Sequence, residues 1–371
     1  MNASTMSRQL TRAGRGSVKA ARKIWDLTTD DRLSRSYYPD EPTKSKPRVL
    51  MELLWWLLRS GEINNYYYVY GLDRKAVDRR KELLPYRQFR RLRNTRNLHT
   101  GRRPYNYVCV LRDKFVFSQF VSSLGIATPR SLALLDAERV TWLDTNVTLP
   151  LRAIVERTDV IFDGFCKKIG GIQGDGAFPL HIEGGSLIVR DRRISVSDLR
   201  DRLDDRYLLQ ERIRQHETMS SLHASSVNTV RLITFATRST VELFAAAMRI
   251  GTHGKSVDNW AAGGVIVSID PECGELRGEG FHKPGYGGRV PRHPDSGIAF
   301  EGFKIPYFAE AVELVSRLHG YLRDIHSIGW DVAITPDGPT IIEGNDDWEG
   351  GIPMVLERDF RQRFLEMCRT K

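Results

Sequence analysis

The apolar positions of this chain change their spacing from Tyr107 onward. Before it, Val49–Gly61 has the spacing of a buried helix, with Trp55 and Trp56 inside it. After it, short apolar runs bounded by Gly, Pro and Asp predict strands, with helical patterns between them. The predicted strands are Arg130–Leu135, Ile161–Lys167, Leu187–Arg190, Tyr207–Ile213, Ser226–Ala236, Val241–Arg249 and Gly264–Ile269, and the predicted helices are Phe115–Leu124, Val196–Leu203 and Phe308–Ile325.

The last two predicted strands, Asp331–Thr335 and Thr340–Ile342, form a hairpin around a Pro-Asp-Gly-Pro turn. Apolar residues nearly fill both strands, which predicts a hairpin buried on both faces. A loop of three residues, Pro336–Gly338, would set Asp331 opposite Glu343, the residue that closes the second strand. The hairpin therefore brings two carboxylates to the same end.

Three oxygen-bearing side chains gather at that end of the hairpin. Glu343 and Asn345 share a face because strand side chains alternate, and Asp331 joins them if the loop has an odd number of residues. Two carboxylates and a carboxamide are a hard, all-oxygen ligand set, suited to Mg²⁺ shared with phosphate oxygens. The alternative is an exposed hairpin with solvated acids. The expected burial favours the metal site, because unpaired buried carboxylates are costly.

A glycine-rich loop follows the strand that ends at Lys167, with glycines at positions 170, 171, 174 and 176. Such spacing lets backbone N–H groups approach phosphate oxygens, although a flexible surface turn has the same composition. The segment is not a Walker loop, because no Gly-Lys-Ser or Gly-Lys-Thr closes it.

Arg231 lies inside an otherwise apolar strand, and a buried arginine needs an anion from the protein or from a ligand. The loop Phe281–Pro294 is rich in Gly, Pro, His, Lys and Arg, a composition typical of substrate loops. The residues that we expect to line a substrate pocket are Asp258, Asn259, Lys283, Arg289, His293, Trp348 and Glu349.

Positive charge is concentrated at the front of the chain. Residues 1–105 hold 24 Lys and Arg against 10 Asp and Glu, whereas the remainder holds 32 against 36. This region, helical or partly disordered over 1–30 and a basic helix or loop over 87–103, would suit an anionic partner, a membrane surface or nucleic acid. A solvated face is the simpler interpretation. The adjacent tyrosines at 66, 67, 68 and 70 indicate core packing rather than a base-stacking platform.

The 371-residue chain has an ordinary globular composition, 41% hydrophobic and 27% charged. Its longest apolar stretch, Val49–Leu58, is about half a membrane span, and the basic N-terminus lacks the apolar segment of a secretory signal. The cysteines at positions 109, 166, 273 and 368 form no zinc or disulfide pattern. We therefore expect a reducing, cytoplasmic location.

Three stretches in a fixed order, SVNTVRLIT, VDNWAAGGVIVSID and GWDVAIT followed by GPTIIEGN, resemble the ATP-grasp superfamily and most closely its sugar-transfer-associated branch. The resemblance implies an α+β, ATP-grasp fold, in which two α+β subdomains with antiparallel sheets grip ATP behind a mainly helical, basic N-terminal region. The implied regions are 1–105 (the N-terminal region), 106–215 (the pre-ATP-grasp part and first subdomain) and 216–371 (the C-terminal subdomain, with the arginine and the magnesium site).

The same resemblance implies individual roles. Lys114 and Lys167 resemble the two phosphate-binding lysines, although Lys168 competes for the second role, and Gln210 resembles the residue that meets the adenine amino group. Glu211 and Ile213 would bind the adenine edge through their backbones. The implied ATP-binding set is Lys114, Lys167, Gly171, Gly174, Gly176, Gln210, Glu211, Ile213 and Glu217, with His216 as a competitor at the ribose, and the implied magnesium ligands are Asp331, Glu343 and Asn345.

The resemblance implies an ADP-forming ligase that uses ATP and Mg²⁺, possible settings being polysaccharide or natural-product modification. A carboxylate would attack the γ-phosphate, and an amine or thiol would displace the acyl phosphate, with Arg231 and Lys167 as the catalytic pair. Positive charge rather than a protein nucleophile would carry this reaction. One alternative is a kinase with the same fold, which leaves the phosphate on its product. The other is a basic anchoring or nucleic-acid-binding protein, which no basic motif interleaved with aromatic residues supports.

Overall fold

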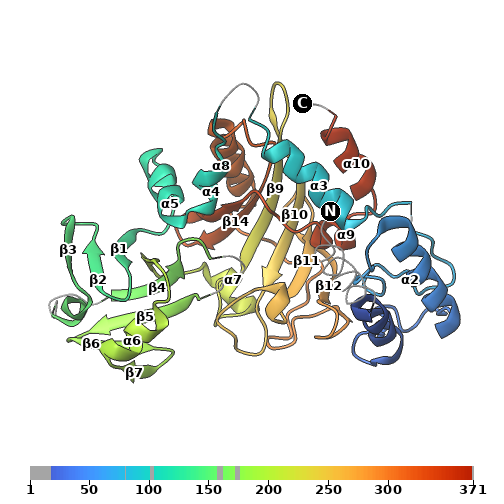
Figure 1. The fold of residues 1–371 in the computed structure, drawn as a ribbon, viewed down its shortest axis with the longest axis horizontal. Coiled ribbons are helices and arrows are strands. Elements are labelled where there is room, and N and C mark those ends of the chain that lie inside the picture. Colours follow the sequence, from blue (N-terminus) through green and yellow to red (C-terminus); the bar gives the residue numbers. More distant parts are fainter. Residues whose placement is uncertain (1–17, 80, 101–103, 157–161, 172–175, 370–371) are drawn as a thin grey trace, which may run out of the picture.

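The computed structural model describes residues 18–79, 81–100, 104–156, 162–171 and 176–369. Within these residues, two sheets lie side by side along the long axis of the molecule, each packed against helices (Figure 1). All strand pairs in this part of the chain are antiparallel. The prediction of an α+β fold with antiparallel sheets is therefore confirmed.

The first sheet has the strand order β3-β2-β1-β8-β4-β5-β6-β7 in the described residues. Its core also takes apolar side chains from the 3-10 helix η1 and the helix α6. The bounds are β1 Ser131–Leu135, β2 Arg139–Trp142, β3 Val147–Pro150, η1 Leu151–Val155, β4 Phe162–Lys168, β5 Phe178–Glu183, β6 Ser186–Val189, β7 Arg192–Ile194, α6 Val196–Arg202 and β8 Tyr207–Glu211.

The second sheet has the order β13-β12-β11-β10-β9-β14-β15 in the described residues. Its two faces belong to two cores, because Val230 and Leu232 pack with the helix α8, whereas Ile233 and Phe235 pack with α9 and α10. The bounds are α4 Val108–Arg112, α5 Lys114–Ser123, α7 Glu217–Leu222, β9 Thr229–Ala236, β10 Val241–Ile250, η2 Trp260–Ala262, β11 Val265–Ile269, β12 Leu276–His282, β13 Arg289–Val290, α8 Phe308–Tyr321, β14 Ser327–Thr335, β15 Gly338–Asn345, α9 Gly351–Leu356 and α10 Phe360–Met367.

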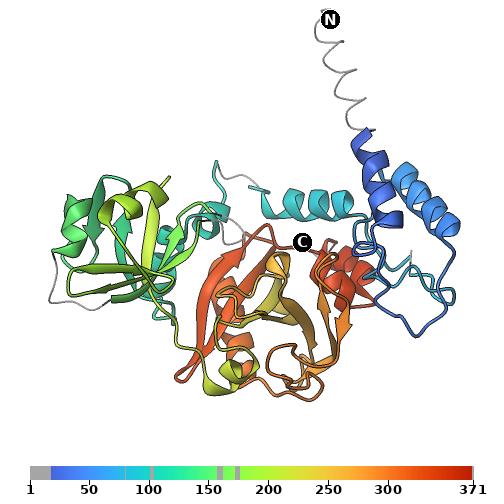
Figure 2. The same ribbon diagram turned by 90° about the horizontal axis from the view of Figure 1, so that it is seen from below.

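The N-terminal region is built from helices and turns and shares its core with the second sheet. Residues 18–29 are helical, and α2 spans Lys46–Ser60 and α3 spans Tyr86–Asn97. Apolar side chains of this region and of the second sheet, α9 and α10 form one cluster. Figure 2 shows the second sheet between the N-terminal helices and the first sheet. The predicted helix around Trp55 and Trp56 is present, but Trp55 is exposed and only Trp56 is buried.

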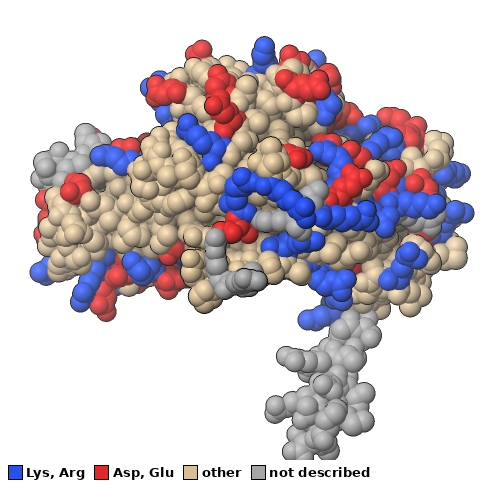
Figure 3. Space-filling view, turned by 90° about the horizontal axis from the view of Figure 1, so that it is seen from above, with Lys and Arg blue, Asp and Glu red and all other residues tan. Residues whose placement is uncertain are grey.

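Basic side chains cover part of the N-terminal region. Arg87, Arg90 and Arg91 of α3 are exposed, and α3 contains no acidic residue. Figure 3 shows a band of Lys and Arg on this side of the molecule, with acidic side chains beside it. In the described part of the chain, no helix has both the length and the apolar character that crossing a bilayer requires.

The hairpin of β14 and β15 pairs Asp331 with Glu343, as predicted, but by a different route. Thr335 pairs with Gly338, so the loop has two residues, Pro336 and Asp337, rather than three. A register shift follows Asp331 and leaves one extra residue in β15. The bulge compensates for the shorter loop, so that Asp331 and Glu343 still lie directly opposite each other. β14 is buried almost throughout, whereas β15 is half-buried, so burial on both faces holds for β14 only.

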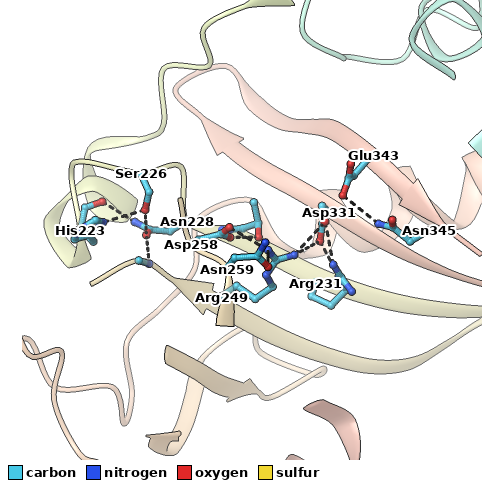
Figure 4. A network of polar contacts seen from close by, with 12 residues as sticks. His223, Ser226, Asn228, Arg231, Arg249, Asp258, Asn259, Asp331, Glu343 and Asn345 are labelled. Atoms are coloured by element: carbon cyan, nitrogen blue, oxygen red, sulfur yellow. Dashed lines mark hydrogen bonds and ion pairs between the residues drawn. The ribbon is translucent and has the colours of Figure 1, made fainter. Parts of the chain in front are cut away.

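A buried ion cluster ties the middle strands of the second sheet together (Figure 4). Arg231 on β9 donates from Nε and Nη2 to the two carboxylate oxygens of Asp331 on β14, at 2.7 and 2.9 Å. Arg249 on β10 donates from Nη1 to the same two oxygens, at 3.1 Å each. Burial opposes ionisation of Asp331, but the two guanidinium groups outweigh it and hold the pKa of Asp331 well below its usual value.

We expect Asp331→Asn to lower the free energy of unfolding by about 3–5 kcal/mol, because it leaves two buried guanidinium groups without their shared charge. Urea denaturation of wild type and variant measures the loss. Asp359→Asn is the control, since Asp359 is 57% exposed and lies 3.7 Å from Arg363, and it should cost less than about 1 kcal/mol. An equally small loss in both variants would contradict a structural role for the cluster.

Candidate functional site

One cleft of about 1290 Å³ brings most of the predicted residues together. Its walls come from β4 and β8 of the first sheet, from β9, β10, β14 and β15 of the second, and from the N-terminal region. The cleft therefore lies where the two sheets face each other.

Four charged side chains form a row across the second sheet, because their strands are neighbours in the order β10-β9-β14-β15. Arg249, Arg231, Asp331 and Glu343 occupy these strands in that order, and all of them line the cleft. Figure 4 shows the row continuing from Glu343 at one end to Asp258 and Asn259 at the other. The cleft therefore has an acidic end, at Glu343, and an arginine end, at Arg249.

Lys167 approaches the acidic end of this row from the first sheet. It lines the cleft on β4, next in sequence to Cys166, which points into the core of the first sheet. Burial lowers the pKa of Lys167, partly offset by the nearby carboxylate of Glu343. Lys168 also lines the cleft, but its Nζ donates to Asp204 at 2.8 Å.

Lys114 is the first residue of α5, and its ammonium group donates to the carbonyl oxygen of Gly171. Asp113 caps this helix by accepting the N–H groups of Phe115 and Val116. Gly176 has φ +69°, and a Cβ there would lie 2.7 Å from the Tyr207 hydroxyl oxygen, so the position requires glycine. Gly174 lies outside the described residues.

β8 and the segment after it supply the predicted adenine-binding residues. Gln210 is buried and donates from Nε2 to the carbonyl oxygen of Pro129 at 3.2 Å. The Glu211 amide donates to the Arg130 carbonyl at 2.9 Å, and its carboxylate accepts from the Arg130 guanidinium at 2.7 Å. Ile213 lines the cleft, and its N–H has no partner within the described chain. This free N–H is the group that an adenine nitrogen would need.

Glu217 and His216 differ in what their side chains do. The His216 ring accepts the N–H of Thr218 at 3.1 Å and so caps α7. Glu217 opens α7, is exposed and lines the cleft. The capping role of His216 leaves Glu217 as the more available group for a ligand.

The predicted metal ligands fit a cation unequally. Glu343 lies opposite Asp331 and accepts from Asn345 Nδ2 at 3.3 Å. Burial and the adjacent Asp331 carboxylate raise the pKa of Glu343, and an adjacent cation would oppose both effects. The four guanidinium bonds to Asp331 fill about four acceptor positions, the capacity of a carboxylate. Glu343 and Asn345 can thus accept a cation directly, whereas Asp331 would need one arginine to turn away.

Sequence reasoning missed Arg249, which occupies the arginine end of the row. Its Nη2 donates to Asp258 Oδ1 and to Asn259 Oδ1, at 3.1 Å each. Thr229 donates to Asp258 through both its N–H, at 3.2 Å, and its hydroxyl. Asp258 and Asn259 therefore position Arg249. The signal was available, because Arg249 interrupts an apolar strand just as Arg231 does.

The other predicted substrate residues divide into two groups. Trp348, Glu349 and Lys283 line the cleft, although Trp348 is 1% exposed and packs mainly in the core. Arg289 and His293 are not among the described residues that line it.

Arg289 and His293 have structural partners, and the substrate role expected for them stays a prediction. Arg289 forms an ion pair with Glu279 at 2.6 Å. His293 is buried and pairs through Nε2 with the Gly251 carbonyl at 2.7 Å. In this loop, an acidic side chain and the backbone satisfy these two basic side chains.

No curated protein matches this chain in sequence. Among solved structures, D-alanine–D-alanine ligase from Helicobacter pylori shares 12% identity over 71% of this chain and 61% of its own, with a TM-score of 0.40. The corresponding enzyme from Bacillus anthracis shares 12% over 71% and 69%, with a TM-score of 0.38. L-amino acid ligase from Bacillus licheniformis shares 10% over 67% and 44%, with a TM-score of 0.37. The chain thus spans about three fifths of the length of the Helicobacter pylori ligase.

These distant structural similarities do not assign the chain to a family, but a family model does. The model of the sugar-transfer associated ATP-grasp family matches residues 93–369, which include both sheets and the whole charged row. The chain belongs to the sugar-transfer associated ATP-grasp family.

Proposed function

We propose that this protein is an ATP-dependent, ADP-forming ligase that activates a carboxylate as an acyl phosphate and transfers the acyl group to an amine or thiol. The observation that carries this proposal is the row Arg249, Arg231, Asp331 and Glu343, which faces Lys167 in one cleft. Three cations around two carboxylates suit the transfer of a phosphoryl group, whose negative charge is spread over its oxygens.

We assign each residue a part of ATP from its position in the cleft. Gln210 and the free N–H of Ile213 would hold the adenine, and Glu217 the ribose. Lys114 and Lys167 would then meet the phosphates at the acidic end of the row. This order follows the cleft from the first sheet to the second and would bring the γ-phosphate beside the arginines.

Mg²⁺, when bound, would neutralise phosphate charge and orient the phosphates. Glu343 and Asn345 would hold it, with Asp331 joining if an arginine turns toward the phosphate. Arg231 would then exchange a carboxylate partner for a phosphate or acyl-phosphate partner, and Arg249, held by Asp258 and Asn259, would keep its place. Such an exchange keeps every buried charge paired.

The experiment that tests the proposed function is a phosphate-release screen with ATP, Mg²⁺ and paired carboxylate and acceptor substrates. A ligase releases ADP and inorganic phosphate together with a joined product. A kinase would leave the phosphate on its product, and that outcome would overturn the proposal. Polysaccharide or natural-product modification and a cytoplasmic location are finer assignments that remain predictions.

Lys167→Ala should weaken ATP binding by roughly tenfold or more, because the phosphates lose a charge-assisted hydrogen bond. Lys168→Ala removes the pair with Asp204, which is 65% exposed, and should change the affinity by less than about threefold. Calorimetric titration of both variants with ATP makes the comparison. A larger loss in Lys168→Ala would move the phosphate-binding role to Lys168.

Glu343→Gln should lower turnover by at least on the order of 100-fold, because it removes one negative charge beside the bound cation while keeping the side-chain shape. Without Mg²⁺ the variant should be as stable as wild type or slightly more so, since the raised pKa of Glu343 shows that its ionised form is disfavoured in the fold. ADP formation and melting temperature, each with and without Mg²⁺, measure both effects.

Glu242→Gln is the control, because Glu242 is exposed on β10 outside the cleft and should keep full turnover. If Glu343→Gln retained wild-type turnover and its dependence on Mg²⁺, Glu343 would have no place in the site.

A further inference from the structure

Four of the residues that line the cleft lie toward its arginine end, and we call this part of the cleft the aromatic pocket: Tyr66, Tyr86, Trp260 and Glu349. The rings of Tyr66 and Trp260 stack, with centroids 5.6 Å apart and planes 26° apart. The Tyr86 hydroxyl donates to Glu349 Oε2 at 2.9 Å. The pocket thus combines aromatic surface with one carboxylate.

Two chains of contacts place the aromatic pocket beside the arginines. Arg249 binds Asn259, and Asn259 directly precedes Trp260. On the other side, a Cβ at Gly329 would lie 2.6 Å from the Cβ of Trp348, the neighbour of Glu349, and 3.7 Å from Nη1 of Arg231. The lysines, in contrast, meet the row at Glu343. A group in the aromatic pocket would therefore reach the arginines from the side opposite the nucleotide.

The Glu349 carboxylate is half-buried and has neutral donors only. Besides the Tyr86 hydroxyl, it accepts the Gly351 N–H at 2.8 Å. Within the described chain no Lys or Arg forms an ion pair with it, although Lys283 also lines the cleft. Arg93 is near enough for its charge to interact with Glu349, but it bonds to the Trp348 carbonyl and to Asp347 instead. A cation bound directly at the Glu349 carboxylate would add a charge-assisted hydrogen bond. Tyrosine and tryptophan faces attract organic cations as well.

The N-terminal region holds half of the pocket. Tyr66 lies in the turn after α2, and Tyr86 is the first residue of α3, so both precede residue 93, where the family match begins. Gly351 lets Tyr66 and Glu349 approach, since a Cβ there would lie 2.9 Å from Tyr66 Cε2 and 3.0 Å from Glu349 Oε1. Burial and the Glu349 charge raise the pKa of Tyr86 to about 12, so Tyr86 remains a donor at neutral pH.

We infer that the aromatic pocket binds the acceptor substrate as an organic ammonium ion, with Glu349 opposing its charge and the rings of Tyr66 and Tyr86, the former backed by the buried Trp260, contacting its carbon frame. The inference rests on the proposed ligase function and narrows it, because it selects an amine over a thiol. It also gives the N-terminal region a part in substrate choice.

The kinetic test uses the amine that is most active in the phosphate-release screen. Glu349→Gln should raise the KM for that amine at least tenfold and leave the KM for ATP and the kcat at saturating amine nearly unchanged. Tyr66→Leu should raise the amine KM severalfold. Glu301→Gln is the matched control, since Glu301 also accepts a backbone N–H, from Gly278, but lies outside the cleft. An unchanged amine KM in Glu349→Gln overturns the inference and leaves the ligase function standing.

A binding test needs no turnover. Saturation-transfer NMR with benzylammonium should show contact with the wild-type protein, and benzyl alcohol, its neutral counterpart, should show much less. Glu349→Gln should abolish the difference, and Glu301→Gln should keep it. Equal contact from both probes in the wild type, or phosphate release with thiol acceptors alone, would overturn the inference. A phosphorylated product would instead overturn the ligase function, whatever the probes show.

A separate observation concerns α2, which has large apolar side chains on two sides, buried on one and exposed on the other. Val49, Leu53 and Trp56 are buried. The opposite side exposes Leu50, Met51, Leu54, Trp55 and Leu58, and the exposed fraction is 43% for Trp55 and 87% for Leu58. We call these five residues the α2 apolar face. So many large apolar side chains on one helix face indicate a second partner.

Charge identifies the partner. Lys46, Arg48 and Arg59 are exposed on α2, and Arg59 lies over the Trp55 ring at 5.4 Å. The acid of this helix, Glu52, contacts Lys44 at 2.9 Å and the Tyr67 hydroxyl at 2.7 Å, and it also pairs with Arg48 at 3.4 Å, which leaves Lys46 and Arg59 without an acid on this helix. An exposed apolar face that is bordered by basic residues and contains tryptophan is typical of helices that lie in the surface of an anionic membrane.

The geometry points to the α2 apolar face as a docking surface for an anionic lipid bilayer, on which α2 would lie without crossing it. The full chain should float with vesicles of phosphatidylcholine and phosphatidylglycerol and not with phosphatidylcholine alone, and added salt should release it. The double variant Trp55→Glu, Leu58→Glu should bind at least tenfold more weakly.

The matched control is Val147→Glu, Leu149→Glu, which places the same charges on two exposed apolar residues of β3 and should leave vesicle binding unchanged. No binding of the wild type to anionic vesicles, or an equal loss in the control, overturns this inference. So does a dimer in light scattering that the Trp55→Glu, Leu58→Glu variant dissociates, because a second copy would then be the partner of the face.

Discussion

The fold and the site both depend on how one carboxylate, Asp331, satisfies two buried arginines. Arg231 and Arg249 come from neighbouring strands, and each donates two hydrogen bonds to Asp331 on a third. The three strands therefore cannot shift in register without leaving a charge unpaired, which is costly in a buried site. Arg249 also pairs with Asp258, so the charges of the cluster balance, and an arginine can meet an anion only by exchanging a carboxylate partner for it. The side chains that fix the strand register thus include the two guanidinium groups that we propose for the phosphates.

The hairpin shows what sequence can and cannot predict about such a site. Apolar spacing and turn residues located both strands, and period-two alternation put Glu343 and Asn345 on one face. The pairing of Asp331 with Glu343 was predicted correctly from a loop length that was wrong. The shorter loop and the bulge each shift the strand pairing by one residue, in opposite directions. The local sequence specifies the resulting pairing but not the combination of loop and bulge that produces it. The side chains that must meet are thus easier to predict than the backbone path that joins them.

Sequence predicted less where the partner of a side chain lies far away along the chain. Arg231 needed an anion, but nothing near it in the sequence showed that Asp331, 100 residues later, would supply one. Arg289 and His293 had the right chemistry for a substrate loop, yet Arg289 pairs with Glu279 and His293 pairs with a backbone carbonyl. Residue type indicates what a side chain can bind, whereas tertiary packing decides whether the protein has already bound it.

The N-terminal region illustrates the same limit on a larger scale. Its composition indicated a basic appendage, and its adjacent tyrosines indicated core packing. The structure shows that Tyr67, Tyr68 and Tyr70 do pack in a core, but this core includes the second sheet and α10. Removing the region would expose that shared core, so it cannot be a detachable anchor. Because the same packing sets Tyr66 and Tyr86 against Glu349, any contact of α2 with a membrane would hold the open cleft at a fixed distance from the lipid surface.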